Sequence, residues 1–206
     1  MLSDAQICDL VGESYNLAPT VVAGDDIRAV VTRIGDETAV ACPGTTDLAG
    51  WLDDFTIWPR LFPVLGWYHD GFGRCGSALY EAAAAKLAVD GRVVFCGHSL
   101  GAQLAQVLAA RFAAARGHSF RCVVFGCPRG AFIGNWTSGR LVRSGLQAIE
   151  YRNYGDPVCV IPPRPMWKHN TRHRDVGARV HALAPAPANH DIALYSANLR
   201  DAAGAA

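Results

Sequence analysis

The sequence predicts a single α/β domain built on a mainly parallel sheet, and three observations lead to this prediction. The chain has 206 residues, an ordinary length for one domain with one core. Short apolar runs typical of strands alternate with segments of helical spacing along most of the chain, which is the order that βαβ units produce. No internal repeat or long linker interrupts this alternation. We therefore expect residues 1–206 to form one compact domain, with helices flanking the sheet.

The first half of the chain supplies two helices and a pair of strands. A helix is expected over residues 3–16, because Ser3 is a good N-cap and apolar residues follow at helical spacing. Residues 27–44 predict two strands joined by a turn at Gly35. Residues 73–90 are rich in strong helix formers and predict the second helix.

The second half repeats the alternation. The expected helices are one that begins near Leu100 and a short final one over 189–204. The expected strands lie within 92–96, 120–128 and 146–158, with a further short strand or hairpin around 179–183. The last residues, 202–206, are expected to fray.

Charge and hydropathy exclude several classes of protein. The chain carries 19 basic and 18 acidic side chains, so we expect no nucleic-acid partner. No stretch approaches the roughly 18 apolar residues of a membrane span, and no transmembrane segment is predicted. The N-terminus lacks the basic run and long apolar core of a secretory signal. We expect a protein that is cytoplasmic or released without a cleaved leader, and the oligomeric state is left open.

The seven cysteines are expected to be reduced thiols. Their number is odd, no C-x-x-C pair occurs, and several lie inside apolar runs. This pattern favours a reducing compartment, although export without a leader or release by lysis would give the same sequence.

The stretch "CGHSLGAQLA" places Ser99 between Gly97 and Gly101, where a strand gives way to a helix. A serine exposed at the end of a buried strand needs a sharp, strained turn, and the flanking glycines remove side chains that would clash there. The same turn directs the N–H of Leu100 into the crevice at the carboxyl edge of the sheet. Ser99 is therefore the candidate nucleophile. The alternative is an ordinary strand-to-helix turn with a capping serine.

This stretch resembles the nucleophile elbow of the class 3 (fungal-type) lipases, a branch of the α/β-hydrolase superfamily. Five further segments are similar to motifs of that family and occur in the same order: "CPGTTDLAGWLDDF", "HDGFGRCGSAL", "VVFGCPRGAF", "YRNYGDPVCVIPP" and "NHDIALY". The resemblance covers roughly residues 28–198 and implies an α/β-hydrolase fold. Pro43 stands where the family usually places Arg, so the anchoring of the oxyanion loop is expected to differ here.

A serine nucleophile needs an imidazole base and a carboxylate that orients it, in the chain order Ser, acid, His. Of the acidic residues after Ser99, only Asp156 directly follows a strand-like run and is turned by Pro157. His190 matches the terminal histidine motif of the family and precedes a helical pattern. Asp156 is the expected acid and His190 the expected base, with His181 as the alternative base.

Two backbone N–H groups are needed to bind the negative oxygen of the tetrahedral intermediate. The N–H of Leu100 is one. Thr45, which follows Pro43-Gly44, fits the position of the second and adds a hydroxyl, whereas an ordinary turn is the alternative interpretation of that segment.

Together these residues predict a serine carboxylester hydrolase, a lipase or esterase, that acts through an acyl-enzyme on a lipid or small acyl ester without any cofactor. An acyltransferase or thioesterase with the same triad and a phospholipase A-type activity stay open, as does a non-catalytic binding module. The neighbouring His98 is expected to form a local hydrogen bond or to pack under the site rather than to act as the base.

The segment between Thr45 and the next helix is rich in aromatic residues. Trp51, Phe55 and Trp58 are candidates for a substrate-contacting lid, and the resemblance implies such a lid together with a transient lipid-interface contact. The alternative is that these aromatic residues belong to the fixed core.

A basic segment covers residues 164–179. It favours a solvated loop, with attraction of anionic head groups as the alternative. His169 and His173 are four residues apart, which suits a metal ion only in a helix, and no metal is predicted.

Overall fold

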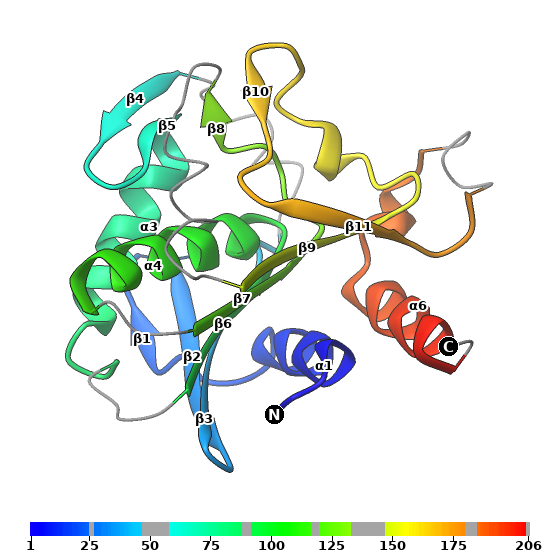
Figure 1. Cartoon of the computed structure of the whole chain (residues 1–206), viewed down its shortest axis with the longest axis horizontal. Helices are drawn as coiled ribbons and strands as arrows, with labels where there is room; N and C mark the ends of the chain where they lie inside the picture. The colour runs from blue at the N-terminus through cyan, green and yellow to red at the C-terminus, as the bar shows by residue number, and fades with distance from the viewer. Residues whose placement is uncertain are drawn as a thin grey trace.

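The computed structural model describes residues 1–24, 27–46, 58–87, 92–116, 120–132, 147–179 and 185–204 (Figure 1). Its centre is a seven-stranded sheet in the order β1-β2-β3-β6-β7-β9-β11. The strands are β1 (Val21–Val22), β2 (Arg28–Ile34), β3 (Glu37–Cys42), β6 (Arg92–His98), β7 (Phe120–Phe125), β9 (Gln147–Asn153) and β11 (Arg172–Val176).

The larger part of this sheet is parallel, as predicted. β3, β6, β7, β9 and β11 pair in parallel, whereas β1, β2 and β3 pair antiparallel. The antiparallel pair β2–β3 closes at Gly35, whose φ is 61°, as expected for a tight hairpin turn. The carboxyl ends of β3, β6, β7 and β9 therefore meet at one edge of the sheet, where ligands bind in open α/β folds.

Helices cover both faces of the sheet (Figure 1). α3 (Asp70–Ala83) and α4 (Leu100–Arg116) lie on one face, and α1 (Asp4–Ser14) packs against α6 (Ile192–Gly204) on the other. Ser3 caps α1 in a capping box with Gln6. Alternate residues of each strand divide between the two cores: Phe95 belongs to the α3/α4 side and Val94 to the α1/α6 side.

α4 is the central helix of the molecule. Every residue from Leu100 to Ala110 is buried, which explains why this segment is apolar around its whole circumference rather than on one stripe. Ser99, which precedes it, is thus fixed to the most deeply buried helix of the fold.

A second, smaller sheet was not predicted from the sequence. It has the order β10-β8-β5-β4 and consists of β4 (Pro59–Phe62), β5 (Gly66–His69), β8 (Ala131–Phe132) and β10 (Trp167–Lys168). β8 and β10 have only two residues each, and β4 contains a proline and an arginine, so none of these three segments shows an alternating pattern.

Two further expectations need correction. The basic segment is not simply a solvated loop, because residues Arg172–Val176 form the parallel edge strand β11 on β9. Its exposed charges suit an edge strand, since they oppose pairing with another chain. The helix expected over 73–90 begins earlier, at Asp70, with the His69 ring as its N-cap, and ends at Ala83. The hairpin expected at 179–183 lies largely outside the described residues.

The cysteines are all free, and six of the seven are buried. Burial raises the pKa of the Cys8 and Cys42 thiols to about 12, so these side chains behave as small apolar residues.

Candidate active site

Ser99 lies at the turn from β6 to α4 with φ = 58°, a left-handed conformation that is strained for a residue with a side chain. Its N–H donates to the Phe125 carbonyl at 3.1 Å. A Cβ atom on Gly97 would lie 2.2 Å from the Gly101 carbonyl oxygen, and a Cβ on Gly101 would lie 2.1 Å from that of Cys42. Both positions therefore require glycine, and the close approach of three backbone segments forces the strained turn.

The loop after β3 lies directly beside Ser99. A Cβ atom on Gly44 would be 2.9 Å from the Ser99 Cβ, so the half-buried Thr45 follows at the rim of the same turn. Leu100 is the first residue of α4, and the N–H groups of a first helical turn have no acceptor within the helix. The two expected oxyanion residues thus flank the candidate nucleophile.

Asp156 and His190, which are 34 residues apart, meet beside Gly126, the residue after the Phe125 carbonyl that accepts the Ser99 N–H. His190 Nδ1 lies 2.9 Å from Asp156 Oδ2 and 3.1 Å from Oδ1. The carboxylate also accepts the Tyr195 hydroxyl at 2.5 Å and the Val158 N–H at 2.8 Å. Burial alone would raise the pKa of Asp156, but the hydrogen bonds from His190, Tyr195 and Val158 outweigh it and hold the pKa below its ordinary value. The carboxylate is therefore ionised at neutral pH and fixes the proton of the imidazole on Nδ1.

Two of the buried polar atoms that lack a hydrogen bond belong to the expected triad. Among the described residues, Ser99 Oγ and His190 Nε2 make no hydrogen bond within the protein. With Nδ1 committed to Asp156, Nε2 is the nitrogen available to accept a proton.

Gly126 was not singled out from the sequence, yet it supports the Asp156–His190 pair. It follows β7 with φ = 56°, and a Cβ atom there would lie 2.8 Å from His190 Cε1 and 3.1 Å from Asp156 Oδ2. The strand end "VVFG" is the signal for it, since glycine directly after a buried strand marks a close approach.

Replacing Gly126 with alanine is expected to lower the free energy of unfolding by about 2–4 kcal/mol, because it combines a left-handed backbone with overpacking. Gly35→Ala is the matched control: its φ is 61° and nothing lies within 4 Å of the added Cβ, so it carries only the backbone cost of about 1 kcal/mol. Urea unfolding measures both. Equal losses in the two variants would contradict the contact with His190.

His98 packs and hydrogen-bonds inside the candidate site, but its partners, Tyr15 and His190, are far from it in the sequence rather than local. Its Nε2 lies 2.7 Å from the His190 carbonyl oxygen, and the two rings are 4.4 Å apart. Burial, with a smaller contribution from His190, lowers the pKa of His98 to about 3, so its ring is neutral at physiological pH.

The buried histidines predict a stability that depends on pH. Burial lowers the pKa of His69 to about 4 and that of His98 to about 3, from the ordinary 6.5. Below pH 6.5 these two histidines bind protons in the unfolded chain but stay neutral in the folded chain. The free energy of unfolding therefore falls as the pH is lowered from 6.5 toward 4. The slope is at most about 1.4 kcal/mol per pH unit for each histidine. Urea unfolding at several pH values tests this. In His69→Gln the unfolding free energy should depend less steeply on pH, because one histidine fewer takes up a proton on unfolding. A flat profile in the wild type would disprove it.

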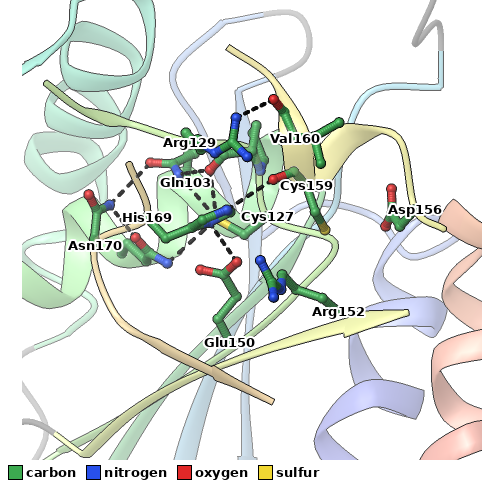
Figure 2. A network of polar contacts seen from close by, with 12 residues as sticks. Gln103, Cys127, Arg129, Glu150, Arg152, Asp156, Cys159, Val160, His169 and Asn170 are labelled. Carbon is green, nitrogen blue, oxygen red and sulfur yellow. Dashed lines mark hydrogen bonds and ion pairs between the residues drawn. The ribbon is translucent and has the colours of Figure 1, made fainter. Parts of the chain in front are cut away.

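A second carboxylate–histidine pair is buried nearby (Figure 2). Glu150 Oε1 lies 2.7 Å from His169 Nδ1, and His169 Nε2 is 2.9 Å from the Cys159 carbonyl oxygen. Both ring nitrogens of His169 lie close to oxygen atoms, so this ring is engaged by the Glu150 carboxylate and the Cys159 backbone. Glu150 is accordingly occupied away from Ser99, and Asp156 lies on the other side of Cys159 (Figure 2).

The structure does not place His169 and His173 on a helix, the arrangement that a shared metal ion would need. His173 lies on β11, and within the described ranges no group of three or more His, Cys, Asp and Glu side chains is arranged to hold a metal ion.

The remaining predicted residues fall near or outside the described part of the chain. Trp51, Phe55 and His181 lie outside it. Trp58 is 74% exposed, so the fixed-core interpretation is wrong for this residue. Tyr195, which donates to Asp156, was missed, because one tyrosine in an amphipathic helix carries no distinguishing pattern.

Comparison with known proteins adds the family. A family model described as "Lipase (class 3)" matches residues 39–166, more than half of the chain. The chain belongs to the class 3 lipase family. No curated protein sequence matches it at a significant level. Helices α1 and α6 lie outside the matched residues, although α6 supplies Tyr195 to the site of this class 3 lipase.

Solved lipase structures share its fold. The triacylglyceride lipase of Rhizomucor miehei superposes with a TM-score of 0.69 at 19% identity, covering 78% of this chain and 66% of the other. A triacylglycerol lipase described as having a serine protease triad at its catalytic centre gives 0.70 at 17% identity, over 91% and 88%. A fungal lipase–inhibitor complex, described as a model for interfacial activation, gives 0.65 at 18% identity, over 85% and 76%. The class 3 lipase therefore has the α/β-hydrolase fold and spans just under two thirds of the Rhizomucor miehei enzyme.

In the part of the chain that the structure describes, no helix combines the length and the apolar character needed to cross a bilayer.

Proposed function

We propose that this class 3 lipase hydrolyses carboxylic esters of lipids by a serine acyl-enzyme mechanism. The observation that carries the proposal is the buried Asp156–His190 pair: its Nε2 makes no hydrogen bond within the described protein, and the His190 ring lies 4.4 Å from that of His98, the residue directly before Ser99. Family membership and the lipase fold support the same activity.

In the proposed mechanism, His190 Nε2 takes the proton of the Ser99 hydroxyl while Oγ attacks the ester carbonyl carbon. The carbonyl oxygen becomes negative and is bound by the N–H groups of Thr45 and Leu100. As the C–O bond to the leaving alcohol breaks, the imidazolium returns its proton to that alcohol, which leaves an acyl-Ser99 ester.

The second half of the cycle uses the same groups in reverse. His190 removes a proton from water, the resulting nucleophile attacks the acyl carbon, and the carboxylic acid departs as Ser99 Oγ regains the proton. Asp156 keeps its negative charge throughout and stabilises the imidazolium formed in each half.

We also infer a transient contact with the lipid surface. Leu61 and Trp67 are cross-strand partners in the β4–β5 hairpin, and they are 62% and 46% exposed. Trp58, directly before β4, is the most exposed of these large apolar side chains. Exposed neighbouring apolar groups of this kind suit an interface, and interfacial activation is described for the fungal lipase–inhibitor complex.

A panel of nitrophenyl esters from acetyl to palmitoyl, together with a triglyceride and a phospholipid, tests the proposal. We expect hydrolysis that depends on Ser99 and prefers an aggregated lipid over a dissolved ester. Products formed with a competing alcohol distinguish hydrolysis from acyl transfer. Absence of ester cleavage and of fluorophosphonate labelling in the wild-type protein would overturn the proposed function.

A further inference from the structure

An unbroken line of polar contacts runs from the loop beside Ser99 to the backbone of the proposed base. The Gly44 N–H donates to the Tyr15 hydroxyl oxygen at 2.9 Å. The Tyr15 hydroxyl lies 2.8 Å from His98 Nδ1, and His98 Nε2 lies 2.7 Å from the His190 carbonyl oxygen. We call this line the Tyr15–His98 bridge.

The direction of every hydrogen bond in the bridge follows from its ends. A carbonyl oxygen only accepts, so His98 Nε2 must carry a hydrogen and donate to His190. The buried His98 ring is neutral, which leaves Nδ1 as an acceptor for the Tyr15 hydroxyl. The Tyr15 oxygen then offers a lone pair to the Gly44 N–H. Each donor and acceptor is used once, so removal of one member leaves its neighbours unpaired.

The bridge passes next to the nucleophile. A Cβ atom on Gly44 would lie 2.6 Å from the Tyr15 hydroxyl oxygen and 2.9 Å from the Ser99 Cβ. Pro43 has no N–H, so Gly44 is the residue through which this end of the loop can donate. Tyr15 reaches this point from the C-cap of α1, which packs against α6.

We propose that Tyr15 and His98 are positioning residues that hold the oxyanion loop and the His190 backbone in register on either side of Ser99. The inference rests on the proposed function. Because the bridge holds the Gly44 N–H, it restrains the backbone from which the following N–H of Thr45 projects. At its other end it anchors the backbone from which the imidazole projects. A small misplacement of the oxyanion N–H or of the imidazole lowers the rate of catalysis, because both must be aligned with the transition state.

Tyr15→Phe removes one hydroxyl and tests the proposal directly. We expect kcat to fall by about 10- to 100-fold with KM within about twofold of wild type, since the transition state rather than substrate binding loses support. The rate of fluorophosphonate labelling of Ser99 should fall in parallel. Tyr151→Phe is the matched control, because it also removes a hydroxyl that hydrogen-bonds to a polar side chain, Asp4 Oδ2 at 2.5 Å, but this hydroxyl takes no part in the bridge.

The outcomes separate positioning from a general loss of stability. Slow catalysis in Tyr15→Phe with normal catalysis in Tyr151→Phe supports the proposal. Wild-type rates in Tyr15→Phe, or equal losses in both variants, overturn it.

Imidazole nitrogen NMR of the wild-type protein gives a second readout that requires no variant to fold. We expect His98 to stay in the neutral Nε2–H form from about pH 5 to 8, and an Nδ1–H tautomer would overturn the bridge. This measurement also stands if the wild type proves inactive toward esters, a result that would reject the proposed function without touching the bridge.

Discussion

Replacing Ser99 with alanine is expected to lower kcat for ester hydrolysis by about 10⁴- to 10⁶-fold, because the proposed mechanism then has no nucleophile to form the acyl-enzyme. The fold should be unaffected. Ser99 already carries a Cβ at φ = 58°, and its Oγ makes no hydrogen bond within the described protein, so the truncation removes no stabilising contact.

Stopped assays with a nitrophenyl ester and labelling with a fluorophosphonate probe measure the effect. Ser196→Ala is a suitable control, since it also removes one hydroxyl, which donates to Asp9 at 2.5 Å on the α1/α6 face. We expect the control to be labelled and active. A labelled Ser99→Ala variant would show that another residue is the nucleophile.

Replacing Asp156 with asparagine is expected to lower kcat by about 10³- to 10⁴-fold with little change in the shape of the site. The carboxylate accepts three hydrogen bonds, from His190, Tyr195 and Val158, whereas an amide has one oxygen and an NH₂ group that donates. If the NH₂ faces His190 Nδ1, the imidazole must carry its proton on Nε2, where it cannot accept one from Ser99. If it faces Tyr195, a buried hydroxyl loses its acceptor.

The pH dependence of unfolding gives an independent readout of this carboxylate. Its pKa is held below the ordinary 3.8, so the stabilisation is present above that pH and is lost as the pH falls through the lowered value. Asp156→Asn should lack this acid-induced loss. Asp36→Asn, an exposed carboxylate paired with Arg92, should retain it and keep full activity. Unchanged kcat in Asp156→Asn would remove this residue from the proposed triad.

The central sheet was predictable because its strands obey local rules. β6 and β7 are short apolar runs bounded by glycine or proline signals. The helix after Ser99 is rich in alanine and leucine, which are strong helix formers. β11 was missed because an edge strand carries charges, and "RHRDV" has no alternating apolar face. The β4–β5 hairpin was missed because its aromatic residues also suit a lid or a core.

The candidate site divides in the same way. Ser99, Asp156 and His190 follow from strand ends and motif order, and the structure places Asp156 against His190. Tyr15, Gly126 and Tyr195 contribute through contacts between segments far apart in the chain. Such contacts depend on how α1 and α6 dock, which no single-sequence pattern encodes.

The docking of α1 against α6 means that two helices outside the family core at residues 39–166 complete the candidate site. Helices packed on the outside of a fold generally open at a lower free-energy cost than a central sheet. Heat or denaturant should therefore abolish the proposed activity by undocking α1 and α6 while the sheet is still intact, and recovered activity after refolding would report that both helices have docked again.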